Sequence, residues 1–258
     1  LEVVVFLLSC HFAKISSRQF QTGAQLKGTV MNPDIREAIT EKERDDVFRF
    51  RYQIYVLEMG RYQAIADHDR RMLIEPEDAF ARIFYAVDDE GKLVATMRLN
   101  WGGDNSISTR QIEQYKIAPF LERLPAELMI VGERIMVIPE LRGSNLIYRL
   151  FQTYLDFVNN HRIQLMFGDC EPHLLNLYFG MGFRTYSARN VNSSETGYLI
   201  PLVMVPEDIA YMRQINSGLL DNLKEFGSDT RVPDCVSHLI EPGGAVLSQA
   251  LAPSEVYR

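Results

Sequence analysis

Cysteine is scarce in this sequence, and its positions exclude two kinds of cross-linked scaffold. The 258 residues include three cysteines, Cys10, Cys170 and Cys235. Their number is odd, and their spacings fit neither a disulfide framework nor a structural zinc site. We therefore expect no metal centre. The low use of cysteine favours a cytoplasmic protein, because thiols stay reduced in that compartment.

A long apolar run is also missing. No stretch approaches the roughly 20 apolar residues that cross a bilayer as a helix. The opening LEVVVFLLSC is apolar for only about ten residues, and Glu2 stands where a signal peptide carries positive charge. A weak signal peptide is the less favoured alternative. The sequence therefore predicts no integral membrane segment, and residues 1–30 are interpreted as a peripheral N-terminal extension.

Positive charge is in deficit. Lys and Arg total 27 against 34 Asp and Glu, which gives a formal net charge of -7. Proteins that bind nucleic acids normally present a basic surface, so we expect no nucleic-acid partner. The sequence also lacks the G-x-S-x-G and G-x-x-x-x-G-K motifs of serine hydrolases and P-loop proteins. Apolar residues nevertheless make up 47% of the chain, enough for a sizeable buried core.

The spacing of the apolar residues predicts alternating strands and helices. Thr40 and Glu43 have the spacing of a capping box, and the apolar residues behind them recur at helical intervals. An antiparallel hairpin and a βαβ crossover together predict an α/β (α+β) fold. The elements expected are helices over 41–58, 111–124, 144–160, 172–181 and 206–224, and strands over 34–39, 80–87, 93–101, 128–138, 163–170 and 197–205.

The turn PELRGSN (139–145) joins a strongly apolar strand directly to a helix. Such a turn directs several free backbone N–H groups to one point, and the helix dipole adds positive potential there. Arg142 contributes donors suited to a phosphate. A pyrophosphate or the phosphate of a phosphopantetheine arm fits this site. An ordinary turn with a solvated Arg142 fits the same residues equally well.

Gly132 and Glu133 interrupt the apolar strand over 128–138. A glycine inside a strand is typical of a bulge or of a close backbone approach. A buried carboxylate is costly unless it is paired, and one with a raised pKa can act as a general base. The alternative is a structural ion pair of Glu133 with Arg134 or Arg98.

Other candidate motifs are weaker. Gly180 and Gly182 match only half of a dinucleotide-binding fingerprint and follow a helix, so we reject that interpretation. Tyr178 is able to donate a proton, although a tyrosine on a short helix more often packs in the core. The run DCEPH (169–173) contains groups that bind metals, but its spacing matches no known site.

Two runs together resemble the GNAT acyltransferases. The run VIPELRGSNLIYRL (137–150) resembles the acyl-CoA signature of that superfamily, and NLYFGMGFR (176–184) is similar to its L-Y-x-x-x-G-F element. The resemblance covers roughly residues 33–205. It implies a GNAT fold, in which a mixed central sheet of about seven strands is flanked by helices and the strands over 128–138 and 163–170 splay apart.

The N-terminal half resembles a narrower group within that superfamily. The run RFRYQIYVLEMG (49–60) and Met97-Arg98-Leu99 look like the acyl-homoserine-lactone synthases and the related N-acyl amino acid synthases. ERIMV (133–137) is similar to their S-R-x-x-V, with Glu133 in place of serine. The N-acyl amino acid synthases, such as N-acyl tyrosine synthases, look closer because of the intact RGSN turn and the tail over 197–213.

This resemblance implies a GNAT acyltransferase domain over 31–205 and a C-terminal helical tail over 206–258. It also implies a long-chain N-acyltransferase that moves a fatty acyl group from a thioester to the α-amine of an amino acid. The donor would be an acyl-phosphopantetheine, on an acyl carrier protein or on CoA, with no permanently bound cofactor. Asn145 and Ile147 replace glycines of acetyl-CoA enzymes, which favours the carrier protein. Tyrosine as the acceptor comes only from the resemblance.

The resemblance also suggests roles for particular residues. Glu133 would take a proton from the amine, and Tyr178 would protonate the departing thiolate. Arg98 or Arg134 would hold the carboxylate of the acceptor. The donor-binding residues would be Met136, Val137 and Ile138 for the arm, and Arg142, Gly143, Ser144 and Asn145 for its phosphate.

Two other functions compete with this one. The first is a short-chain, acetyl-CoA-dependent N-acetyltransferase that acts on a small amine or a protein. The second, of a different class, is a non-catalytic module that senses an acyl ligand.

Overall fold

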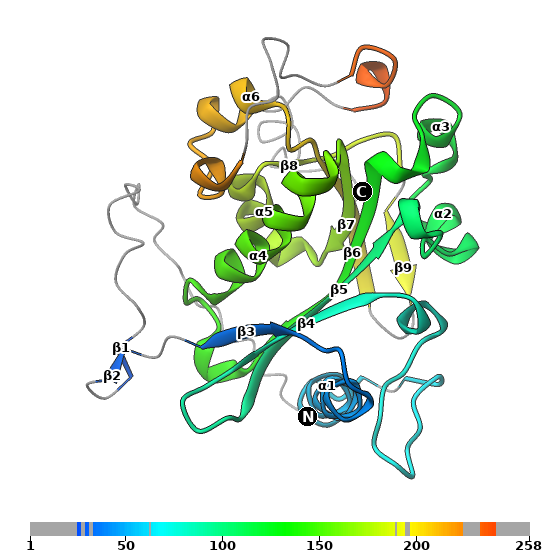
Figure 1. The fold of residues 1–258 in the computed structure, drawn as a ribbon. Helices are drawn as coiled ribbons and strands as arrows, with labels where there is room; N and C mark the ends of the chain where they lie inside the picture. The colour runs from blue at the N-terminus through cyan, green and yellow to red at the C-terminus, as the bar shows by residue number, and fades with distance from the viewer. Residues whose placement is uncertain are drawn as a thin grey trace, which may run out of the picture.

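One mixed sheet organises the protein (Figure 1). The computed structural model describes residues 25–26, 29–30, 33–61, 63–188, 190–193, 197–223 and 233–240. The strand order is β3-β4-β5-β6-β7-β10-β8, with β9 paired to β10, so the expected α/β sheet of about seven strands is confirmed. The strands are β3 (Asp34–Glu37), β4 (Arg82–Val87), β5 (Leu93–Trp101), β6 (Met129–Val137), β7 (Leu165–Cys170), β8 (Phe183–Arg184), β9 (Val191–Ser193) and β10 (Gly197–Met204), and β1 (Gln25–Leu26) pairs β2 (Thr29–Val30) separately.

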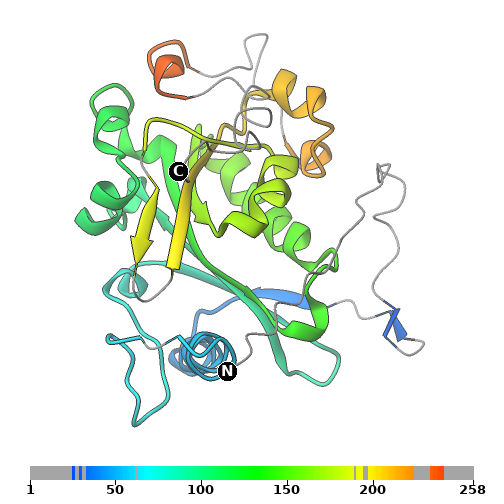
Figure 2. The ribbon, with the colours of Figure 1, turned by 180° about the vertical axis from the view of Figure 1, so that it is seen from behind.

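Helices cover both faces of this sheet. In Figures 1 and 2, α4, α5 and α6 lie on one side of the central strands, α2 and α3 lie on the other, and α1 lies beside β3 to β5. The largest buried cluster lies between the sheet and α4, where Leu150 and Tyr154 are fully buried. The helices are α1 (Glu41–Tyr52), α2 (Thr109–Gln114), α3 (Ala118–Leu121), α4 (Leu146–His161), α5 (Leu175–Met181) and α6 (Ile209–Gln214).

The expected capping box begins α1. The Thr40 hydroxyl accepts a hydrogen bond from the Glu43 N–H at 3.2 Å, and the Glu43 carboxylate accepts one from the Thr40 N–H at 2.8 Å. The helix predicted over 41–58 changes form at its end, because Gln53–Glu58 continues as a π-helix, η2. Single π-helical turns are rare in proteins overall, but those that occur are often found at functional sites.

β6 and β7 separate part of the way along their length. They pair in parallel only at Met129–Val131 and Leu165–Phe167, although β6 continues to Val137 and β7 to Cys170. Their outer edges stay paired with β5 and β10 along this length, so only the edges that face each other lose their partners. Gly132 and Gly168 stand where the pairing stops, and a Cβ on Gly168 would lie 3.1 Å from the Gly132 carbonyl oxygen. The expected splay is therefore present, and the missing Cβ of Gly168 allows the close approach to Gly132 from which it starts.

Two of the expected helices are shorter than the sequence predicts. The helix expected over 111–124 is two helices, α2 and α3, because Lys116 adopts a left-handed conformation with φ of 50° between them. The helix expected over 206–224 is only α6, which ends before Asn216 at φ of 54°, and a separate 3-10 turn at Leu220–Asn222. The short strands β8 and β9 were not expected. Local patterns do not show where a single residue takes a left-handed conformation.

The described part of the tail packs on the same cores as the domain. Met212 and Leu219 are fully buried in the cluster beneath α4, and Val236 and Ile240 belong to a second cluster that includes Phe120. The division into 31–205 and 206–258 stays a prediction, and residues 1–24 lie outside the described residues. Within the described part of the chain, none of the helices has both the length and the apolar character needed to cross a membrane.

A glycine pair offers a test of the packing around β5. A Cβ on Gly102 would lie 2.0 Å from the Ala126 carbonyl oxygen, so Gly102→Ala must move backbone and is expected to lower the free energy of unfolding by about 1–3 kcal/mol. Gly180, inside α5, has room for a Cβ, since its nearest neighbour would be 3.8 Å away. Gly180→Ala is therefore the matched control and is expected to raise stability by about 0.5–1 kcal/mol. Urea denaturation measures both, and equal stability of the two variants would contradict the assigned packing.

Candidate active site

A network of buried charges begins at Arg98 on β5. Arg98 is fully buried, and its NH1 donates to Glu75 Oε2 at 2.8 Å and to Asp78 Oδ1 at 3.1 Å. Its NH2 donates to Glu133 Oε2 on β6 at 2.5 Å. The register of the two strands explains the last contact, since Arg98 lies directly opposite Glu133. One guanidinium on β5 therefore links three carboxylates, one from β6 and two from the loop before β4.

The loop before β4 supplies two of these carboxylates. Glu75 lies directly before the 3-10 turn η3 (Pro76–Ala79), and Asp78 lies within it. Glu75 and Asp78 form a capping box, in which each side chain accepts from the other residue's backbone N–H. Arg51 of α1, fully buried, donates to Asp78 Oδ1 at 2.7 Å. Arg134 donates to both oxygens of Glu75. Burial would raise the pKa of Glu75, but the surrounding guanidiniums of Arg134, Arg98 and Arg51 outweigh it and hold that pKa below its usual range.

Glu133 receives donors from several sides. Besides Arg98, its carboxylate accepts from Gln111 Nε2 at 2.7 Å, from the Tyr115 hydroxyl at 2.9 Å and from Arg110 NH2 at 3.2 Å. Burial alone would raise its pKa, but Arg98, Arg110 and the nearby Arg134 lower the pKa of Glu133 to about 2. The alternative that the sequence offered, an ion pair of Glu133 with Arg134 or Arg98, is confirmed for Arg98. The raised pKa that the sequence suggested is wrong, because so many donors surround the carboxylate.

Arg134 stands at a bulge. The β5–β6 register shifts between Thr96 and Arg98, and Arg134 opposite this shift adopts a left-handed conformation with φ of 57°. Non-glycine residues in that region are strained by about 1–2 kcal/mol. The bulge turns the guanidinium toward Glu75 and places it 5.2 Å from the centre of the Tyr55 ring in η2. Arg134 is 13% exposed, whereas Arg98 is sealed in the core.

Tyr178 lies on the other side of the opening between β6 and β7. It is 5% exposed on α5, and its ring stands edge-on to Phe151 and Phe183. Burial raises its pKa well above the ordinary value, and the neighbouring Cys170 and Asp169 on β7 add to that shift. Among the described residues, no hydrogen bond engages the Tyr178 hydroxyl. The Tyr178 hydroxyl is therefore protonated at neutral pH.

The donor-binding residues expected from the sequence follow β6 in one continuous segment. Met136 and Ile138 are buried on the α4 side, and Val137 and Arg142 are joined by a 3.0 Å hydrogen bond from Arg142 Nε to the Val137 carbonyl. Arg142 also pairs with Glu58 at the end of η2 at 2.6 Å. The turn is tight, with Gly143 at φ of 80°.

Two backbone donors of this turn have no acceptor among the described residues. Ser144 Oγ accepts from the Leu146 N–H at 3.2 Å, which caps the first turn of α4. Asn145 occupies the N-cap position, but its side chain does not cap the helix. Among the described residues, the N–H groups of Gly143 and Asn145 make no hydrogen bond. Two N–H groups are therefore open at the start of a sixteen-residue helix, and the expected anion cradle at this turn stays a prediction.

Sequence reasoning missed several members of the network. Arg51 carried a signal, because it lies four residues after Val47 on the buried stripe of α1. Asn100, which accepts a hydrogen bond from Gln111, gave a similar signal, because it stands between apolar residues on β5. Others gave none, since they are separated widely in the chain and meet only in the fold: Glu75, Asp78, Arg110, Gln111 and Tyr115.

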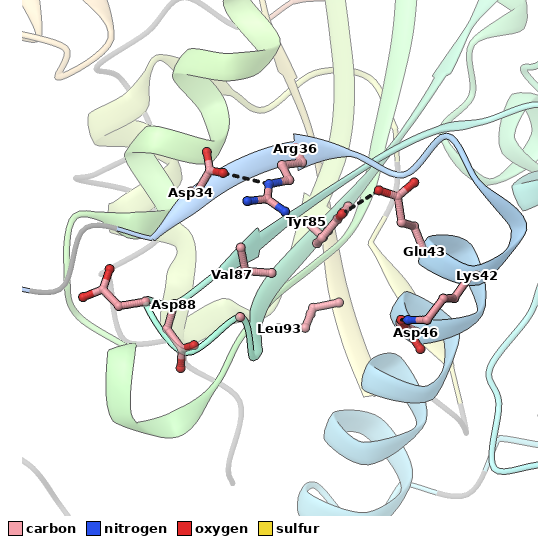
Figure 3. A pocket seen from close by; sticks show the side chains of 11 residues that line it. Asp34, Arg36, Lys42, Glu43, Asp46, Tyr85, Val87, Asp88 and Leu93 are labelled. Carbon is pink, nitrogen blue, oxygen red and sulfur yellow. Dashed lines mark hydrogen bonds and ion pairs between the residues drawn. The ribbon is translucent and has the colours of Figure 1, made fainter.

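A separate groove lies at the turn end of the β4–β5 hairpin (Figure 3). Its side chains come from β3, β4, the β4–β5 turn, the start of β5 and the first turns of α1, and some of them pair with one another. Arg36 Nε donates to Asp34 at 2.7 Å, and the Tyr85 hydroxyl donates to Glu43 at 2.9 Å. None of the residues expected for catalysis or donor binding lines it. The splay between β6 and β7 is therefore the stronger candidate site.

A metal site was sought among the His, Cys, Asp and Glu side chains. In the described segments, no three His, Cys, Asp or Glu side chains are placed to hold an ion. Cys170 is buried, and burial first, then Asp169, raises the pKa of its thiol to about 12. A thiol with that pKa is a poor nucleophile at neutral pH.

Comparison with known proteins gives one family match. The sequence matches the family model described as an acetyltransferase (GNAT) domain over residues 50–152. It matches no curated protein. The matched range ends within α4, so it includes the network around Arg98, β6 and the turn that begins α4.

Solved structures of similar fold include two kinds of synthase. The CoA-dependent acyl-homoserine lactone synthase BjaI, solved with SAM and isopentyl-CoA, has a TM-score of 0.54 and 16% identity over 80% of this chain and 97% of its own. FeeM, an N-acyl amino acid synthase from uncultured soil microbes, has a TM-score of 0.52 and 16% identity over 75% and 99%. The acyl-homoserine lactone synthase LasI has a TM-score of 0.53 and 11% identity, over 77% of this chain and 98% of its own. The chain therefore carries an acetyltransferase (GNAT) domain and has the GNAT fold.

Proposed function

We propose that this protein is an N-acyltransferase that moves an acyl group from a phosphopantetheine thioester to the α-amine of an amino acid. The observation that carries this proposal is the opening between β6 and β7, which has Glu133 at one wall and leads to the anion cradle before α4. The opening leaves backbone donors and acceptors of β6 without strand partners, which suits an extended amide-containing arm. The structures solved for BjaI and FeeM support acyl transfer as the reaction class.

In this proposal the donor arm lies along the free edge of β6. Amides of the arm pair with backbone groups near Met136 to Ile138, and a phosphate reaches the open N–H groups of Gly143 and Asn145. Arg142 then exchanges its ion pair with Glu58 for one with the phosphate. A backbone N–H of β6 stabilises the oxyanion that forms when the thioester carbonyl is attacked.

The acceptor approaches from the side of the charged network. Glu133, held as a carboxylate, attracts and orients the amine. Arg134 is the arginine assigned to the acceptor carboxylate, because its side chain is partly exposed at the bulge. Arg98, which the sequence offered for the same task, is sealed and has its NH1 and NH2 groups engaged. In this proposal Arg98 acts on the substrate only by fixing Glu133.

The reaction then exchanges one bond for another. The neutral amine nitrogen attacks the thioester carbonyl, the N–C bond forms, and the C–S bond breaks. The amine loses one proton, and the departing sulfur gains one. Tyr178 is assigned as the donor to sulfur, since its hydroxyl stays protonated and makes no hydrogen bond to any described side chain. The products are an N-acyl amino acid and a free thiol.

A long acyl chain and a carrier protein are the finer parts of the proposal. The core between the sheet and α4 contains six of the ten methionines, Met97, Met136, Met166, Met181, Met204 and Met212. Methionine side chains adapt their shape, so this core is suited to admit an apolar chain. Asn145 and Ile147 at the cradle carry side chains that crowd a pyrophosphate, which favours the single phosphate of a carrier protein.

The test measures thiol release and product together. The purified protein is supplied with acetyl or palmitoyl thioesters, each on CoA and on an acyl carrier protein, with and without a mixture of amino acids. We expect thiol release that requires both the palmitoyl thioester and an amino acid, with a matching N-acyl amino acid in the mass spectrum. Turnover of acetyl-CoA alone would favour the short-chain acetyltransferase. Binding of thioester without turnover of any donor would favour the acyl-ligand sensor.

A further inference from the structure

A second carboxylate faces Glu133 across the opening. Glu133 lies two residues beyond the last paired residue of β6, and Asp169 lies two residues beyond the last paired residue of β7. The Tyr115 hydroxyl stands between them, 2.9 Å from Glu133 Oε1 and 2.8 Å from Asp169 Oδ2. Tyr115 is fully buried directly after α2, so this hydroxyl is fixed in place.

One hydroxyl proton cannot serve two anionic acceptors. Tyr115 is able to donate to one carboxylate only, and its oxygen then presents a lone pair to the other. If both carboxylates were charged, the Tyr115 oxygen would have a hydrogen bond to one of them and a close contact without a proton to the other. Both contacts are hydrogen bonds when Asp169 is protonated and donates to Tyr115, while Tyr115 donates to Glu133.

The surroundings decide which carboxylate holds the proton. Glu133 accepts from Arg98, Arg110 and Gln111 in addition to Tyr115, so it stays charged. Asp169 has only one other donor among the described residues, Gln114 Nε2 at 3.2 Å, and this contact also falls on Oδ2. Asp169 Oδ1 therefore makes no hydrogen bond with the described residues, and the side chain is partly exposed.

Electrostatics agree with this division. Burial first, and then the charge of Glu133, raises the pKa of Asp169 to about 6, while Glu133 stays near 2. Two neighbouring carboxyl groups with separated pKa values are typical of an acid–base site. The groups that face Asp169 are Gln114 and Tyr115 at the end of α2, Glu133 and Arg134 on β6, Tyr178 on α5, Tyr186 after β8, and the adjacent Cys170.

We propose that Asp169 is the catalytic base of this site and accepts the proton of the attacking amine at Oδ1. This inference rests on the proposed function. As the amine nitrogen bonds to the thioester carbon, its proton moves to Asp169, and the C–S electron pair leaves with the sulfur. The sulfur takes a proton from Tyr178, and the proton on Asp169 returns to Tyr178 through solvent. Atoms and charge balance to one amide and one thiol.

The first test is the pH dependence of kcat/KM for acyl transfer. For the wild type we expect a limb that rises with pH through about 6, because only the deprotonated carboxylate accepts a proton. Asp169→Asn keeps the shape of the side chain but is expected to lower kcat/KM by about 10²–10⁴-fold and to remove that limb. Asp156→Asn, at an exposed position of α4, is the matched control. This variant is expected to keep the wild-type kcat/KM and the rising limb.

The second test uses the neighbour. Glu133→Gln removes a negative charge beside Asp169 and frees Tyr115 to donate to it, so the rising limb in this variant is expected below pH 6. Asp169→Asn with an unchanged profile, or Glu133→Gln with an unmoved limb, would overturn the role of Asp169. A wild-type protein that transfers no acyl group to any amino acid would instead overturn the proposed function, and the role of Asp169 with it.

Discussion

Replacing Arg98 by methionine is expected to lower the free energy of unfolding at pH 7 by about 3–5 kcal/mol. The methionine fills a similar volume but leaves Glu75, Asp78 and Glu133 buried near one another with one cation fewer. Breaking one partner of a buried ion pair is costly because the remaining charges are uncompensated. Urea denaturation monitored by circular dichroism measures the loss.

The pH dependence of this loss separates charge from packing. In the wild type, Glu133 and Asp78 have pKa values below those of an unfolded chain, so they contribute stability above pH of about 4, which is lost as the pH falls. In Arg98→Met the same carboxyl groups protonate more easily, and the gap to the wild type is expected to narrow on acidification. Arg36→Met, at an exposed ion pair, is the control and is expected to match the wild type. A variant of Arg98 as stable as the wild type at pH 7 would contradict the assigned network.

Replacing Glu133 by glutamine is expected to lower kcat for acyl transfer by about 10²-fold or more and to leave donor binding unchanged. The amide keeps the shape of the carboxylate but removes the charge that attracts and orients the amine. The donor contacts lie further along the chain, near Met136 to Ile138 and in the turn before α4, so thioester affinity does not depend on that charge. Stopped-flow turnover and equilibrium binding of a non-hydrolysable thioester analogue measure the two quantities.

The control for Glu133→Gln is the same substitution at an exposed glutamate, Glu122. Glu122→Gln changes an exposed side chain that pairs only with Arg123 among the described residues, and its turnover is expected to equal that of the wild type. A denaturation curve of Glu133→Gln confirms that the protein is folded under assay conditions. Turnover of Glu133→Gln equal to that of the wild type would remove Glu133 from the reaction.

Local patterns in the sequence predicted the parts of the fold that depend on local contacts. The Thr40–Glu43 capping box and the two strands of the β4–β5 hairpin were predicted correctly, because neighbouring residues form them. The break between α2 and α3 was missed, since the left-handed Lys116 lies in a sequence that otherwise suits one helix. This break also hid Tyr115, which follows α2 and bridges the two carboxylates.

The site depended on contacts that no local pattern encodes. Glu133 and Arg98 were recognised because each interrupts an apolar strand. Their partners Arg51, Glu75 and Asp78 come from a helix and a loop that reach the strands only in the folded chain. Asp169 was visible at the end of an apolar strand, but its importance depends on the distance to Tyr115 and Glu133. Burial and charge, which fix the pKa of each group, are properties of the assembled site.

The π-helical turn η2 sets the rotation of the chain that leaves α1. A turn of this kind holds more residues than an α-helical turn, in which each residue advances the side chains by about 100°. Tyr55, which stacks on Arg134, and Glu58, which pairs with Arg142, both lie in η2. Deleting one residue of Gln53–Glu58 would restore α-helical winding and rotate every later side chain by about that angle. The π-helical form of η2 therefore fixes the directions in which Tyr55 meets Arg134 and Glu58 meets Arg142.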